Sequence, residues 1–197
     1  MLWIPATLAA AAFQVARNAA QRSLIGGAGP WGATLVRFLF GLPFSVLFQL
    51  IVWLIDGRTA VAHFDLAFFG FATTGAFAQV MGTAALLVAM RQAGFAVGTA
   101  VQQSALPLAG VLGWLLFHDD LSTRAWIGVG VATAGLAVLT WPRKADGAAP
   151  LSGAAYGLLS GLLIGFALNA YRHASLTIAP GHPLYGATVT VTVTQAL

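Results

Sequence analysis

Long apolar runs separated by short polar stretches form the pattern of this chain. Six runs and part of a seventh stand out, and Gly, Pro, His or charged residues gather between them. Because an apolar run of about 20 residues matches the thickness of a bilayer, each full run predicts a membrane-spanning helix. The predicted helices cover residues 2–20, 31–55, 64–90, 95–117, 125–141, 151–171 and 184–197.

The last run is ambiguous, because Thr188, Thr190, Thr192 and Thr194 alternate with other residues. Taken alone, this period of two indicates a β-strand. A lone strand in a helical membrane protein would leave its edges unpaired, so we expect a helix here as well. The predicted fold is therefore all-α and polytopic.

The composition indicates that lipid, not water, surrounds the chain. Hydrophobic residues make up 59% of the 197 residues and charged residues 7%, whereas soluble domains carry about 25% charged residues. The absence of Cys excludes disulfides and thiolate chemistry. The four His lie in four different links without metal-ligand spacing, and the Lys and Arg are scattered singly. We therefore expect no metal, no cofactor, no enzymatic activity and no nucleic-acid partner.

A short motif recurs in the two parts of the chain. Gly32-Ala33-Thr34 near the start of the second predicted helix returns as Gly186-Ala187-Thr188 near the start of the seventh. The two copies lie five helices apart, so they enter the membrane in opposite senses. Such inverted repeats are common in secondary transporters. We predict a five-helix unit over residues 1–144 and the start of an inverted second unit over 145–197. Ten helices are expected in a complete protein, of which this chain would be a truncated form.

Several stretches resemble the EamA-type transporters of the drug/metabolite transporter superfamily. PWGATLVRFLFG, with Arg37 and Phe38, is similar to the second helix of that family. ALLVAMRQAGFAVGTAVQQSALPLAGVLGWLLF resembles its third-to-fourth helix passage, and FHDDLSTRAWIGVGVATAGLAVL its link into the fifth helix. This chain has Asp119 where the family usually has Glu, and Asp120 where a basic residue is usual. The resemblance implies a ten-helix transporter of small metabolites.

Polar side chains inside the apolar runs are the candidate substrate contacts. Each has a structural alternative, because such residues also hydrogen-bond neighbouring helices. Arg37 has the further alternatives of snorkelling to the headgroups or pairing with helix-end carbonyls. The candidates are Gln14, Asn18, Arg37, Gln79, Gln102, Gln103 and Asn169.

Two features of the links and helix faces indicate packing roles. Asp119 and Asp120 precede the fifth helix, where Ser122 and Thr123 are candidate N-caps, so capping and loop structure are the expected roles of this stretch, with ion binding as the alternative. Glycines recur every four residues in the sixth helix and allow a neighbouring helix to approach closely. They are Gly153, Gly157, Gly161 and Gly165. The sequence leaves open whether this face meets the same chain or a second copy in a homodimer.

These features favour a multi-pass secondary transporter of the cytoplasmic membrane. Its partners would be the lipid bilayer and a small neutral or anionic metabolite of the amino-acid or organic-acid class, moved by alternating access. One alternative is a channel component or a non-transporting membrane subunit. Another is a multidrug exporter, which the absence of Glu disfavours, because small multidrug pumps of the superfamily use an intramembrane Glu.

Overall fold

The computed structural model describes residues 3–57, 61–140 and 151–197, and every regular element in these ranges is a helix. The elements are α1 (Trp3–Val52), the short π-helical η1 (Trp53–Gly57), α2 (Leu66–Ala93), α3 (Phe95–Gln102), α4 (Ala105–Leu116), α5 (Thr123–Thr140), α6 (Leu151–Ile178) and α7 (Pro183–Ala196). The all-helical prediction is confirmed. The threonine-rich run forms helix α7, as expected from its context. The predicted boundary between residues 144 and 145 lies outside the described residues.

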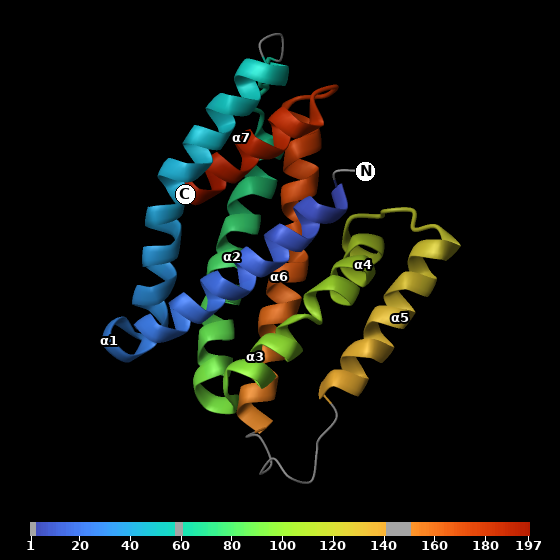
Figure 1. Ribbon diagram of the computed structural model, residues 1–197. Coiled ribbons are helices and arrows are strands. Elements are labelled where there is room, and N and C mark those ends of the chain that lie inside the picture. The colour runs from blue at the N-terminus through green and yellow to red at the C-terminus, as the bar shows by residue number, and fades with distance from the viewer. Residues whose placement is uncertain (1–2, 58–60, 141–150) are drawn as a thin grey trace.

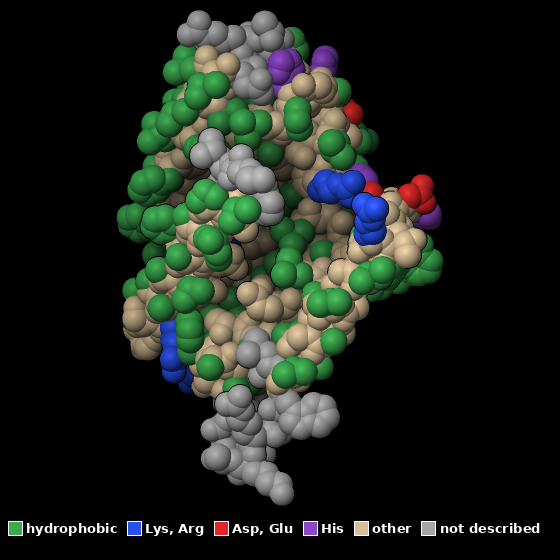
Figure 2. Space-filling model, turned by 45° about the vertical axis from the view of Figure 1, so that its right-hand side comes forward, with side chains coloured by type: hydrophobic (Ala, Val, Ile, Leu, Met, Phe, Trp, Pro, Cys, Tyr) green, Lys and Arg blue, Asp and Glu red, His purple; other side chains and the backbone are tan. Residues whose placement is uncertain are grey.

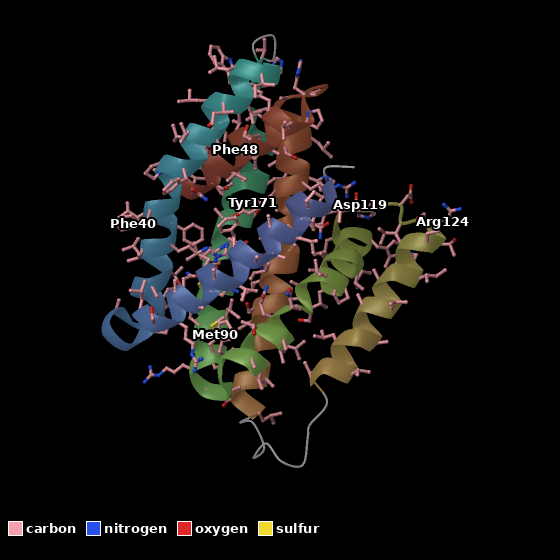
Figure 3. All side chains as sticks on the ribbon, in the orientation of Figure 1. Phe40, Phe48, Met90, Asp119, Arg124 and Tyr171 are labelled. Atoms are coloured by element: carbon pink, nitrogen blue, oxygen red, sulfur yellow. The ribbon has the colours of Figure 1, made fainter. Side chains whose placement is uncertain are left out.

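Four helical segments are long and apolar enough to cross a membrane. They are Gly26–Ile55, Leu66–Ala93, Phe95–Leu116 and Leu151–Ile178. A fifth apolar helix, Thr123–Val138, is shorter. Large apolar side chains of the first segment stand on the outer surface, and Phe40 among them points away from the bundle (Figure 3). Outward-facing Phe and Leu side chains suit a helix that borders lipid. The chain is thus a helical protein with several candidate membrane helices.

The antiparallel helices α2 and α6 lie side by side in the centre of the bundle (Figure 1). The second half of α1 and α7 lie on one side of this pair, and α3, α4 and α5 lie on the other. The two central helices approach closely because α2 carries Gly82, where a Cβ atom would lie 2.9 Å from Ile164. Ser160 donates a 2.7 Å hydrogen bond to the Gly82 carbonyl across this contact. Small residues and a buried interhelical hydrogen bond therefore join the central pair.

The other face of α6 packs against its own chain. Gly157 contacts Val101 of α3, and Gly161 contacts Ser104 in the α3–α4 link. Gly165 lies against the backbone of Ala105 and Ala109 in α4. This glycine face is therefore occupied by α3 and α4, and a homodimer through it would have to displace them. The glycines of α5, in contrast, have no neighbouring atoms within 4 Å of an added Cβ; these are Gly128, Gly130 and Gly135.

The predicted link over residues 21–30 is wrong, because the first helix continues to Ala28. The backbone leaves the helical region only at Gly29, whose φ of 68° and ψ of 175° suit glycine. Pro30 follows and has no N–H to donate to the carbonyl four residues earlier. α1 folds back at this point, so it consists of two helical halves joined by a single residue (Figure 1).

The predicted helix over residues 95–117 is divided in two. Pro107 removes the donor that would bind the Gln103 carbonyl, and Leu106 N–H binds that carbonyl instead at 3.2 Å. The N–H groups of Gln103 and Ser104 likewise bind carbonyls only three residues back, at 3.1 and 3.0 Å. This tighter turn ends α3 and redirects the chain into α4.

The two copies of the Gly-Ala-Thr motif have similar local surroundings. Each lies in the first turns of a helical segment that starts at a proline, Pro30 or Pro183. Thr34 and Thr188 are both buried, and each donates a 2.8 Å hydrogen bond to a carbonyl of its own helix. In Figure 1, α7 runs roughly opposite to the second half of α1, whereas the first half of α1 runs obliquely to α6. The inverted repeat itself stays a prediction.

The contact between α6 and α4 provides a test of this packing. In Gly165→Ala the new methyl group would lie 3.0 Å from the Ala105 carbonyl oxygen and 3.1 Å from the Ala109 nitrogen, so backbone must move. We expect the free energy of unfolding in detergent to fall by about 1–3 kcal/mol. The control Gly128→Ala adds the same methyl group where no atom lies within 4 Å. It should leave stability unchanged or raise it by about 1 kcal/mol. Equal melting temperatures for the two variants would contradict the packing described here.

Candidate functional site

A cavity of about 250 Å³ lies between the first half of α1 and α3. Its polar lining comes from four amide side chains and one hydroxyl, and we call it the amide cavity. The lining residues are Ala11, Gln14, Val15, Asn18, Phe95, Thr99, Gln102 and Gln103. Figure 2 shows the surface hollowed between the first half of α1 and the α3–α4 region. Four of the seven candidate site residues thus come together.

Helical spacing in α1 and the break after α3 bring the four amide side chains to the cavity. Gln14 and Asn18 are four residues apart and share one face of α1. Gln102 is the last residue of α3, and Gln103 follows it at the break that Pro107 causes. Asn18 and Gln102 are almost fully buried, whereas Gln14 and Gln103 are exposed. The cavity therefore has a buried end and an open end.

Positive charge flanks the amide cavity. The Arg17 guanidinium donates a 3.2 Å hydrogen bond to Oδ1 of Asn18, a lining residue. The Arg22 guanidinium carbon lies 5.7 Å from the ring centre of Phe95, in a cation–π contact with another lining residue. Within the described part of the chain, neither guanidinium has a carboxylate within 4 Å. The local potential is therefore positive and favours anions.

Arg37 does not line the amide cavity. Its Nη1 donates a 2.7 Å hydrogen bond to Oγ1 of Thr83 on α2, and its guanidinium lies 5.2 Å from the Phe38 ring centre. Thr83 is fully buried, and its hydroxyl donates a 2.8 Å hydrogen bond to the Gln79 carbonyl. The partner of Arg37 is thus a hydroxyl inside the bundle and not a helix-end carbonyl.

The two remaining candidates lie elsewhere. Gln79 is half-buried on α2, outside the cavity. Asn169 Nδ2 donates to the Ala109 carbonyl at 2.8 Å and to the Gly165 carbonyl at 3.1 Å. The bond to Ala109 ties α6 to α4, which is the structural alternative considered for this residue, and the bond to Gly165 lies within α6.

Residues beyond the sequence candidates also belong to this region. Arg17, Thr99 and Phe95 either line the cavity or contact its lining. Gln21 lies one helical turn beyond Asn18, is almost fully buried, and its Nε2 has no hydrogen-bond partner among the described residues. The spacing of residues 14, 18 and 21 places all three on one helical stripe. That signal was present in the sequence, but the predicted end of the first helix at residue 20 concealed it.

A charged cluster outside the cavity joins the α4–α5 link to α6. Arg172 Nη1 lies 2.6 Å from Oδ2 of Asp119, and His173 Nε2 lies 3.7 Å from its Oδ1. The His173 ring stacks on Phe117 with centres 4.9 Å apart. Figure 3 shows Asp119 in this link, near the end of α4. Asp119 thus has a structural role in the link, and Ser122 caps α5, as expected, by accepting from the Ala125 N–H at 3.3 Å.

The buried partner of Arg37 can be tested by one substitution. Thr83→Val keeps the shape but removes the hydroxyl, which leaves the half-buried guanidinium without its acceptor. We expect a loss of about 1–3 kcal/mol in the free energy of unfolding. The control Thr133→Val removes a similar bond to the helix carbonyl of Val129, at 2.7 Å, on exposed α5. It should change stability by less than about 0.5 kcal/mol. Similar losses in both variants, measured by thermal unfolding in detergent, would show that Arg37 does not depend on Thr83.

Comparison of the chain with protein-family models, with curated proteins and with solved structures finds no match.

Proposed function

We propose that this protein is a multi-pass secondary transporter of the cytoplasmic membrane that moves a small neutral or anionic metabolite by alternating access. One observation carries the proposal. A cavity lined by amide side chains lies beside a break between α3 and α4, within a segment long enough to span the membrane. Substrate sites of secondary transporters are commonly built where membrane helices are interrupted.

The chemistry of the cavity supports a polar solute over a lipid or a hydrophobic drug. Amide groups both donate and accept hydrogen bonds, so they can replace the water shell of a metabolite. In the part of the chain that the structure describes, no acidic residue lines the cavity. A cationic drug would find no counter-charge there, and a multidrug exporter is accordingly the weaker candidate.

The inverted repeat and the EamA-type resemblance are part of the same proposal. The shared Gly-Ala-Thr motif, the prolines before it and the opposite directions of the helices that carry it support a five-plus-five architecture. In such a protein the two units would enclose the substrate near the middle of the membrane. The amide cavity would then be the contribution of the first unit.

Transport can be tested with the full chain reconstituted in phospholipid vesicles. Vesicles preloaded with an unlabelled metabolite should exchange it for the same labelled metabolite outside, for at least one solute in a panel of amino acids and organic acids. Gln102→Leu should lower this exchange at least tenfold, because a buried amide of the cavity is lost. The control Gln92→Leu alters an exposed residue near the end of α2, outside the cavity, and should not lower it.

Two outcomes would overturn the proposal. If no solute exchanges faster than in protein-free vesicles, the protein does not transport this class of metabolite. If the vesicles instead show an ion conductance that Gln102→Leu leaves intact, a channel component is the better description.

A further inference from the structure

We propose that the amide cavity is selective for small organic anions, with a carboxylate held by Arg17 and the uncharged body of the solute among the amide side chains. This inference rests on the proposed function, since it names the substrate class of the same site. It also narrows that class, because it excludes neutral solutes and disfavours zwitterions.

Arg17 is placed to receive a carboxylate. Arg17 is an exposed residue, and its guanidinium uses one nitrogen, Nη2, for the 3.2 Å bond to Asn18. An arginine has five N–H donors in a planar fork, so several donors stay available for a carboxylate bound in two-point fashion. The bond to Asn18 also fixes the guanidinium next to the cavity wall, which reduces the entropy lost on binding.

The charges around the cavity favour a net negative solute. Arg22 stacks on Phe95 in the cavity wall, and Arg37 lies within electrostatic range of Arg17. Among the described residues, no Asp or Glu lines the cavity, and the ion pair of Arg172 with Asp119 joins α6 to the α4–α5 link. In Figure 2 the acidic side chains lie toward the edge of the molecule and not in the hollow.

The absence of an acid in the cavity wall sets the selectivity. A zwitterion would bring an ammonium group into the cavity without a carboxylate to pair with it, and burying an unpaired charge is costly. A neutral amide would gain no binding free energy from the positive potential, because it carries no net charge. An anion of matching size is attracted by the positive potential of the cavity, and Arg17 serves as its counter-ion.

The size of the cavity completes the description of the solute. A volume of about 250 Å³ corresponds to roughly eight water molecules at about 30 Å³ each. This suits a four- to six-carbon acid.

Binding to three solutes that share a carbon skeleton tests this selectivity. Glutarate, glutamate and glutaramide carry two carboxylates, two carboxylates with an ammonium, and no charge. Their affinities for the full chain in lipid nanodiscs are measured by calorimetry. The series succinate, adipate and their diamides covers the neighbouring sizes. We expect at least one diacid to bind at least tenfold more tightly than its diamide, and glutamate to bind more weakly than glutarate.

Variants identify the charge responsible. Arg17→Gln should weaken diacid binding at least tenfold and leave diamide binding unchanged, and Arg17→Lys should restore part of the loss. The control Arg124→Gln removes an exposed arginine at the start of α5, away from the cavity (Figure 3), and should change neither affinity. Circular dichroism and the elution profile of each variant confirm that it is folded.

Failure of this inference differs from failure of the proposed function. If every diamide binds as tightly as its diacid, if no diacid binds, or if folded Arg17→Gln binds diacids unchanged, anion selectivity through Arg17 is wrong. If a neutral solute nevertheless exchanges in vesicles, the proposal that the protein is a transporter is still supported. Conversely, Arg17-dependent diacid binding without any exchange would support the anion site and remove the transport proposal.

Discussion

α6 packs closely against α2 on one side and against α3 and α4 on the other, and these contacts determine how the other helices are arranged. In lipid there is no hydrophobic drive to bring helices together, so association depends on packing and on hydrogen bonds. α6 meets α2 across Gly82 and Ser160, and it meets α3 and α4 across its own row of glycines. Because α3 is held by α6, its inner face is fixed opposite the first half of α1. The amide cavity exists because this fixed wall faces a helix that is only loosely packed.

Interruptions of the backbone then decide which side chains enter the cavity. Pro107 shortens the hydrogen-bond pattern at residues 103 and 104 and so ends α3 with Gln102 and Gln103 at the cavity. Gly29 and Pro30 turn α1 back on itself, so that its first half can lie across the bundle while its second half faces outward. The break between α3 and α4 thus lies directly beside polar side chains of the cavity.

The helices were predictable from the long apolar runs, and the polar residues inside them identified half of the residues that line the cavity. Gln14, Asn18, Gln102 and Gln103 stood out because an amide within an apolar run needs a partner. Their separation from Asn169 and Arg37 could not be predicted, because it depends on which helices are neighbours. The continuation of the first helix through residues 21–28 was missed since polar residues and glycines there resemble a link. The pairing of Asp119 with Arg172 joins two elements distant in sequence, and no local pattern indicates it.

The single-residue joint in α1 has a mechanical consequence. A continuous helix resists bending because each change of direction breaks hydrogen bonds, but at Pro30 the bond to the carbonyl of residue 26 is already absent. Gly29 has no side chain to restrict rotation. The arm that carries Gln14 and Asn18 can therefore pivot about this joint at small energetic cost, while the arm beyond it stays against α7. The stiffness of one wall of the cavity is thus set by two adjacent residues that never touch a solute.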